Sequence, residues 1–211
     1  MRNLIAPSRY YLANRLGRVY LESMAEVTGR NGLNALLNLT EASQYIDCLP
    51  ADDLELGFDI AVIANINQTM ELIYGPRGAR GLALRGGRVM YGRLLRAFDL
   101  STGFNRIAFR MLPVHSRIRI GIPAFARVMM QHSDQTHSVA DKGTFYDYVV
   151  ERCAACWGQQ VRSPVCHLVV GLLQEALSSF GRGQEFQIVQ TECRAMGAPA
   201  CVFRIEKEPI A

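Results

Sequence analysis

Cysteine thiols are the side chains of this chain best suited to chemistry, and five of the six lie in its last third. They form three groups: Cys153 with Cys156, then Cys166, and finally Cys193 with Cys201. Thiolates are typical ligands of structural zinc, which takes four ligands in a closed tetrahedral shell and has no redox chemistry. If the three groups converge in space, their spacing predicts one metal site. The alternative is a set of buried thiols without metal, since a free cysteine behaves as a small apolar residue.

The elements that carry the cysteines favour this convergence. The pattern of the last third predicts two hairpins with a helix between them, with strands over 137–140, 144–152, 185–192 and 201–206 and the helix over 164–180. Cys166 then opens the helix, where the helix dipole favours a thiolate. Cys193 and Cys201 flank the turn of the second hairpin and so face each other. Cys153 and Cys156 lie where the first hairpin ends in a loop.

The first 130 residues show helical periodicity instead. Apolar residues recur at three- and four-residue steps, which predicts helices over 14–28, 32–39, 59–74 and 79–98, and one or two over 104–130 with a break near Pro123. The sequence therefore predicts an α+β fold in which a helical layer, residues 1–130, packs on a small antiparallel sheet of about four strands. Residues 131–211 carry that sheet, one helix and the cysteines. Because no linker or internal repeat interrupts the chain, we expect residues 1–211 to form a single domain.

The net charge of +4 is unevenly distributed. Eleven arginines lie between Arg77 and Met130 against a single acid, Asp99, whereas nine of the 19 acidic residues lie between 20 and 75. Such a basic segment either holds phosphate or packs beside the acidic segment. No nucleic-acid-binding motif accompanies the arginines, and aromatic residues are not interleaved with them, so we expect no nucleic-acid partner.

The N-terminus and the hydropathy pattern predict a cytoplasmic protein. Charge and proline interrupt residues 1–9 before any apolar run develops, unlike a secretion signal. No stretch approaches the roughly 18 apolar residues of a membrane span. In the cytoplasm thiols stay reduced, which favours metal binding over disulfides.

Three phrases around the cysteines resemble the 4-vinyl reductase domain. They are Cys-Ala-Ala-Cys-Trp-Gly at 153–158, Pro-Val-Cys-His at 164–167, and Thr-Glu-Cys-Arg-Ala-Met-Gly-Ala-Pro-Ala-Cys at 191–201. Residues 29–39 and 74–81 also resemble stand-alone members of this family. The resemblance implies the fold of small subunits of the TRAPP vesicle-tethering complex and of haem-based nitric-oxide sensors. In that fold helices pack on an antiparallel sheet, often around an apolar cavity and often in dimers.

The resemblance also implies a set of zinc ligands. In the phenol-sensing members a cysteine opening the helix, a glutamate three residues before the next cysteine and two cysteines eight residues apart hold zinc. Cys166, Cys193 and Cys201 match, but the glutamate position holds Gln190, a poor zinc ligand. We therefore expect Cys156 as the fourth ligand, with Cys153 and then Glu192 as alternates.

The function that this resemblance implies is a sensor or binding module for a small apolar or aromatic molecule, a hydrocarbon for example, with a structural zinc. Pocket residues would come from the helices and the sheet, although plain core is the alternative for each: Phe104, Ile107, Met111, His115, Phe125, Met129, Phe145 and Tyr146. A homodimer through the helix over 14–28 and a regulatory protein partner are further expectations.

Two other functions stay open. One is a 4-vinyl reductase of tetrapyrroles, or an accessory protein of bacteriochlorophyll synthesis; the other is a dimeric assembly platform. The chain lacks a Gly-x-Gly-x-x-Gly fingerprint, and a closed zinc shell has no open catalytic position, so an enzyme is the less favoured reading and NAD is not expected. Haem is not expected either, because no histidine lies in a proximal-ligand motif.

Overall fold

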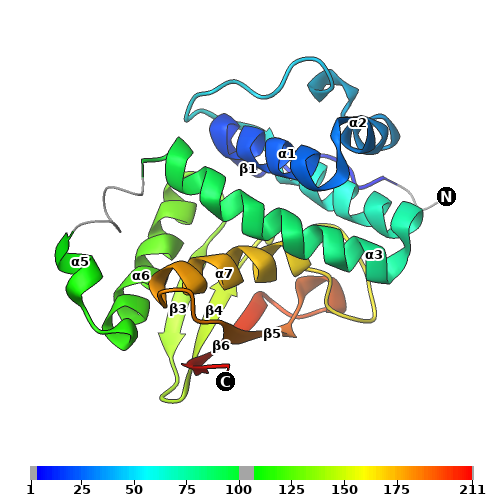
Figure 1. The fold of residues 1–211 in the computed structure, drawn as a ribbon. Helices are drawn as coiled ribbons and strands as arrows, with labels where there is room; N and C mark the ends of the chain where they lie inside the picture. Colours follow the sequence, from blue (N-terminus) through cyan, green and yellow to red (C-terminus); the bar gives the residue numbers. More distant parts are fainter. Residues whose placement is uncertain (1–3, 100–106, 211) are drawn as a thin grey trace.

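A four-stranded antiparallel sheet forms the C-terminal third of the computed structural model, which describes residues 4–99 and 107–210 (Figure 1). The strand order is β3-β4-β6-β5, with β3 at His137–Asp141, β4 at Phe145–Val150, β5 at Phe186–Glu192 and β6 at Cys201–Pro209. Alternation along β4 turns Tyr146, Tyr148 and Val150 toward the core. The expected α+β class, with a helical layer on a four-stranded antiparallel sheet, is therefore confirmed.

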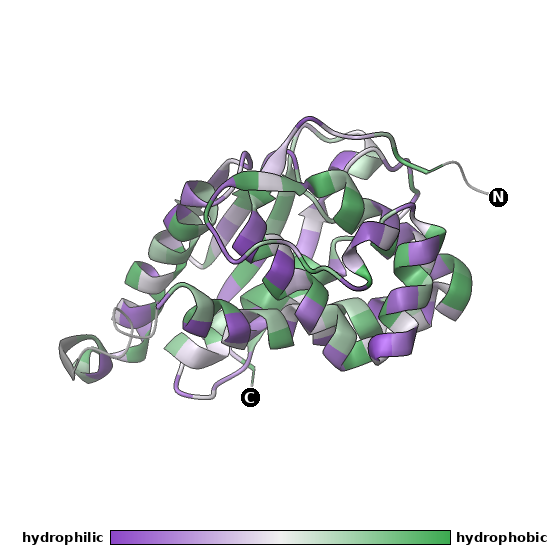
Figure 2. Cartoon of the chain, turned by 90° about the horizontal axis from the view of Figure 1, so that it is seen from above, coloured by the Kyte–Doolittle hydropathy of each residue, from purple (hydrophilic) through white to green (hydrophobic). Residues whose placement is uncertain are grey.

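Helices cover one face of this sheet (Figure 1). They are α1 (Asn14–Thr28), α2 (Arg30–Leu39), α3 (Ile60–Ala97), α5 (Ile107–Met111), α6 (Val114–Gln131) and α7 (His167–Phe180). Two short 3₁₀ turns, η1 and η2, lie at Ser43–Tyr45 and Arg194–Met196. Figure 2 shows hydrophilic and hydrophobic residues alternating along the outer helices, as expected of amphipathic helices with one buried side.

The helix α3 begins and bends where the sequence predicts. Asp59 caps it by accepting a hydrogen bond from the backbone N–H of Ala61 at 2.7 Å. Gly75 has a positive φ of 69°, a conformation that suits glycine, and it divides α3 into two helical halves. The two predicted helices on either side of Gly75-Pro76 are thus joined end to end across a kink.

The predicted break near Pro123 is wrong. The helix α6 continues through Pro123, and the chain breaks instead at Leu112-Pro113, just before α6. Proline removes the hydrogen bond to the carbonyl four residues earlier, that of Arg119, and Arg119 is exposed. The buried side of α6 packs without interruption on either side of the proline, at Ile118, Ile122, Phe125 and Ala126.

A second sheet of two short strands was not predicted. β1 (Tyr11–Ala13) pairs antiparallel with β2 (Leu56–Asp59) and joins the chain before α1 to the chain before α3. Three or four residues are too few to show an alternating pattern in sequence. The pairing also places Asp59 beside Ser8, whose hydroxyl donates to the Asp59 carboxylate at 2.6 Å.

One arginine of the basic segment meets the acidic N-terminal segment. Arg93 of α3 forms ion pairs with Glu22 at 3.1 Å and Glu26 at 2.8 Å, both on α1. Across residues 4–99 and 107–210, every helix is too short or too polar to span a bilayer.

The helices α3 and α7 cross in backbone contact. A Cβ atom added at Gly87 would overlap the carbonyl oxygen of Leu168, and one added at Gly171 would overlap the carbonyl oxygen of Leu84. Each helix therefore supplies a glycine at the point where its neighbour comes closest. This crossing sets the position of α7, which also contacts β5 and α6.

We expect Gly87→Ala to lower the free energy of unfolding by about 3 kcal/mol, because the two helix backbones must move apart. Gly81→Ala is the matched control in the same helix: no described atom lies within 4 Å of its added Cβ. The control should gain about 0.5 to 1 kcal/mol from helix propensity. Urea unfolding of the two variants measures both changes, and equal effects would contradict the close crossing.

Candidate functional site

The fold brings the cysteine groups together at one end of the sheet. Cys153 and Cys156 lie in the loop after β4, and Cys166 is the N-cap residue of α7. Cys193 follows β5, and Cys201 begins β6 opposite Val150 of β4. All five side chains are buried. Residues separated by up to 48 positions in sequence thus surround a single point, whereas Cys48 is exposed and lies outside this group.

The sulfur atoms have the spacing of a tetrahedral shell. The ligand atoms of Cys153, Cys156, Cys166 and Cys201 all lie within 4.8 Å of one another. The Sγ–Sγ distance is 3.7 Å from Cys166 to both Cys153 and Cys201, and 3.4 Å from Cys156 to Cys201. Zinc–sulfur bonds of ~2.3 Å in a tetrahedron place neighbouring sulfurs about 3.8 Å apart. The four sulfurs therefore fit a zinc ion.

The fifth thiol, Cys193, lies beside this group. Its Sγ is 4.0 Å from the Sγ of Cys166. The group of four contains Cys153 in the position where the sequence analysis placed Cys193, and both Cys156 and Cys166 belong to it. Glu192, the other alternate, is exposed. The geometry thus offers two residues, Cys153 and Cys193, for one remaining ligand position.

Hydrogen bonds among the thiols distribute the charge of the cluster. Hydrogen bonding with Cys153 and its neighbours raises the pKa of Cys166, and burial raises it further. The Sγ of Cys201 instead receives hydrogen bonds from the surrounding thiols, which lowers the pKa of Cys201. Several thiolates in a buried site repel one another, so full ionisation of the cluster requires a cation.

Backbone and amide groups hold the cluster in place. The N–H of Arg194 donates to the Sγ of Cys201 at 3.4 Å. The N–H of Cys166 donates to the Oε1 of Gln190 at 3.1 Å. Gln190 occupies the position of the glutamate in the phenol-sensing members, and here its amide oxygen satisfies the N–H of the residue that caps α7. Such outer contacts fix the orientation of ligating residues.

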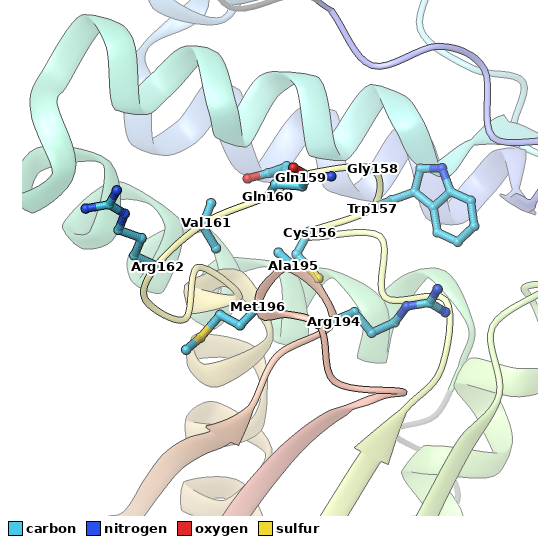
Figure 3. A pocket seen from close by; sticks show the side chains of 11 residues that line it. Cys156, Trp157, Gly158, Gln159, Gln160, Val161, Arg162, Arg194, Ala195 and Met196 are labelled. Atoms are coloured by element: carbon cyan, nitrogen blue, oxygen red, sulfur yellow. The ribbon is translucent and has the colours of Figure 1, made fainter.

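An open groove of about 730 Å³ adjoins the cluster at Cys156. Figure 3 shows Gln159, Gln160 and Val161 on one side of it and Ala195 and Met196 on the other. Arg194 lies over the ring of Trp157, with 5.4 Å from its guanidinium carbon to the ring centroid. A metal ion can therefore approach the buried sulfurs from this side.

A second, enclosed cavity of about 40 Å³ lies between the sheet and the helices. Its walls come from β3 and β4 on one side and from α3, α6 and α7 on the other, and nearly all of them are apolar. Two polar side chains break this pattern, His137 of β3 and Gln135 just before it, and both are buried. The cavity has space for no more than a few water-sized groups.

His137 has one hydrogen-bonded and one free ring nitrogen. Its Nδ1 lies 3.0 Å from the hydroxyl oxygen of Tyr148, while its buried Nε2 has no hydrogen-bond partner among the described residues. Burial lowers the pKa of His137 to about 4, so the imidazole is neutral at pH 7. A buried polar atom without a partner is costly, and a ligand that bonds to it removes that cost.

The residues predicted to line a pocket are dispersed. Phe125 and Met129 line the enclosed cavity, and Tyr146 is buried on β4. Met111 and His115 are exposed, and Phe145 lies partly exposed on β4 beneath Arg204. Ile107 is the first residue of α5, and Phe104 lies outside the described residues.

Sequence reasoning did not select the polar residues of the cavity. The signal was the alternation of the first hairpin: His137 and Tyr148 lie on paired strands and both point inward. A histidine at an inward strand position needs a polar partner, and the tyrosine two residues from the paired Val150 supplies it.

Residues 146–207 match the family model of the 4-vinyl reductase domain. The match begins within β4 and ends within β6, so it includes all five clustered cysteines. The resemblance recognised from the cysteine phrases is thus confirmed for this segment. The comparison with curated proteins finds no match.

Solved structures show the fold of the whole chain. An H-NOX protein from S. oneidensis in the Fe(II)NO ligation state is 17% identical, with 95% of this chain and 100% of that chain covered and a TM-score of 0.54. This likeness establishes the shared fold, and with it the expected relation to the haem-based nitric-oxide sensors.

Two further structures are more distant. The phenol-responsive sensory domain of the activator PoxR with phenol is 17% identical over 72% of this chain and 79% of its own, with a TM-score of 0.46. A trafficking protein particle complex subunit 3 from Naegleria fowleri, covalently bound to palmitic acid, is 15% identical over 71% and 84%, with a TM-score of 0.42.

We expect the buried imidazole to make stability depend on pH. Because the pKa of His137 falls from about 6.5 in the unfolded chain to about 4 in the fold, the unfolded state binds the extra proton between these pH values. The free energy of unfolding should fall by on the order of 3 kcal/mol as the pH drops from 6.5 to 4. His137→Gln should flatten this loss in urea unfolding, whereas exposed His115→Gln should retain it.

Proposed function

We infer that the chain is a small-molecule sensor or binding module whose ligand occupies the enclosed cavity and whose cysteines hold a structural zinc. The observation that carries this proposal is the free Nε2 of His137 in an otherwise apolar cavity. Ligand sites are typically apolar with a few placed polar groups. The family match and the H-NOX fold support the same class of function.

The cavity selects for size and for one polar contact. A volume of about 40 Å³ is far below that of the ~150 Å³ cavities that bind benzene, so a larger ligand must displace side chains. Met90 and Met129 line the cavity, and methionine side chains change shape at low cost. A hydroxyl group suits the free Nε2 because it can donate to it or accept from it, whichever tautomer Tyr148 favours.

Ligand binding would act on α7. Leu168, Leu172 and Leu173 of this helix line the cavity, and the same helix begins at Cys166. Because Gly171 lies against α3, α7 has little freedom to move sideways. A ligand between the sheet and α7 would therefore be felt at the α3–α7 crossing and at the cysteine cluster.

Zinc would be held by Cys156, Cys166 and Cys201 together with Cys153 or Cys193. Bound there, zinc supplies no reactive position and acts by joining the loop after β4, the start of α7 and the β5–β6 hairpin. Structural zinc contributes on the order of 10 kcal/mol of binding free energy in small modules. The metal would thus hold the wall of the cavity formed by α7.

The ligand proposal predicts different responses to phenol and benzene. His137→Leu removes the polar anchor and keeps an apolar side chain, so phenol should bind at least tenfold more weakly while benzene binds unchanged. Isothermal titration calorimetry measures both affinities, and Tyr148→Phe should weaken phenol binding less. Equal loss of both ligands, or no loss of either, would refute His137 as the anchor.

The metal proposal predicts one zinc per chain in protein purified without chelator. Cys166→Ser and Cys201→Ser should lose the metal and melt at lower temperature, whereas exposed Cys48→Ser should keep it. Comparing Cys153→Ser with Cys193→Ser identifies the remaining ligand, since only one of them should reduce the zinc content below about half an equivalent. Less than about a tenth of an equivalent in the parent protein would contradict the site.

The predicted homodimer needs a surface other than the apolar stripe of α1. That stripe is buried within the same chain at Leu16, Val19, Tyr20 and Met24. Exposed apolar residues occur nearby at Leu72, Ile73 and Tyr74 of α3. The dimer stays a prediction that light scattering at micromolar concentration tests. Tetrapyrrole reduction and a pure assembly role gain no specific support from the described residues.

A further inference from the structure

A separate groove of about 500 Å³ lies outside the enclosed cavity, between α3, the start of α7 and β5. It begins at the kink of α3 near Pro76 and passes over His167 to Gln190 on β5. The groove shares no lining residue with the groove at Trp157 except Gln159, among the residues that the structure describes. Neither the cysteine cluster nor the ligand cavity accounts for it.

Cationic side chains dominate its charge. Arg77 and Arg80, one helical turn apart on α3, are exposed and form no ion pair with any described residue. His167, half-buried at the first turn of α7, faces the same space, and the charge of Arg80 contributes to lowering its pKa after burial. Glu71 is the one acid among the described lining residues. Two unpaired guanidinium groups on one helix face suit a carboxylate or a phosphate.

The remaining wall is apolar. Met70, Ala83, Val170 and Ile188 lie along it, and Val189 of β5 leaves 46% of its surface exposed. Asn67 adds a buried Oδ1 without a hydrogen-bond partner in residues 4–99 and 107–210, while its Nδ2 donates to the carbonyl of Ala155 at 3.0 Å. A purely polar anion would leave this apolar wall in contact with water, and a neutral apolar molecule would leave the arginines unused.

We propose that this groove binds an amphiphilic anion, with the carboxylate or phosphate at Arg77 and Arg80 and the apolar body along Val170 and Val189. The Coulomb attraction is between exposed groups, so binding weakens as salt rises. The apolar body adds affinity in proportion to the surface that it buries. Gln190 connects this groove to the cysteine cluster, because the same side chain that lines it accepts the N–H of Cys166.

Four probes separate the two halves of the proposed ligand: octyl phosphate, octanoate, 1-octanol and inorganic phosphate. We expect octyl phosphate or octanoate to bind at least tenfold more tightly than 1-octanol and inorganic phosphate, by calorimetry at low salt. Arg77→Gln combined with Arg80→Gln should weaken the charged amphiphile at least tenfold and leave 1-octanol unchanged. The matched control, Arg127→Gln, removes one exposed arginine of α6 that lies outside the groove.

Val189→Asp tests the apolar half at an exposed position that the fold tolerates, and it should also weaken octyl phosphate. Inorganic phosphate binding as tightly as octyl phosphate would overturn the proposal in favour of a plain anion site. Unchanged affinity in the double arginine variant would overturn it as well. His137→Leu should leave binding of the charged amphiphile intact, so this groove and the enclosed cavity are tested separately.

Discussion

Backbone contact between α3 and α7 is the constraint on which both candidate sites depend. Gly87 and Gly171 allow the two helices to meet without side chains between them. The crossing fixes α7, and α7 carries Cys166 at its N-cap and Leu172 and Leu173 along the cavity. Interiors are close-packed, so a shift of this helix by the width of a methyl group would change sulfur distances and cavity shape together.

The two sites use burial in opposite ways. In the cysteine cluster, burial makes several neighbouring thiolates unfavourable unless a cation joins them, so desolvation favours metal binding. In the cavity, burial keeps His137 neutral and leaves its Nε2 without a partner among the described residues, which favours a neutral ligand with a hydrogen-bonding group. The sheet serves both, since β4 supplies Tyr148 to the cavity and leads directly into Cys153.

Elements with long, regular patterns were predictable, and short or context-dependent ones were not. The helix over 14–28 and the strands around the 141–143 turn lie where their periodicity indicates. The short strands β1 and β2 carry too few residues for a pattern. Pro123 shows the reverse case, where a strong local signal for a break loses to the packing of Ile122 and Phe125 on the buried side of α6.

The sequence by itself determined the α+β class, the approximate elements and the fact that cysteines recur at positions able to converge, because these follow from local periodicity and spacing. Tertiary structure alone decided which sulfurs lie within bonding distance of a common centre, and it placed Cys153 inside that group and Cys193 beside it. It also decided that His137 meets Tyr148 in a closed cavity. Distances of this kind depend on how loops and crossing helices pack, and contacts between residues far apart in the chain leave no periodic signal in one sequence.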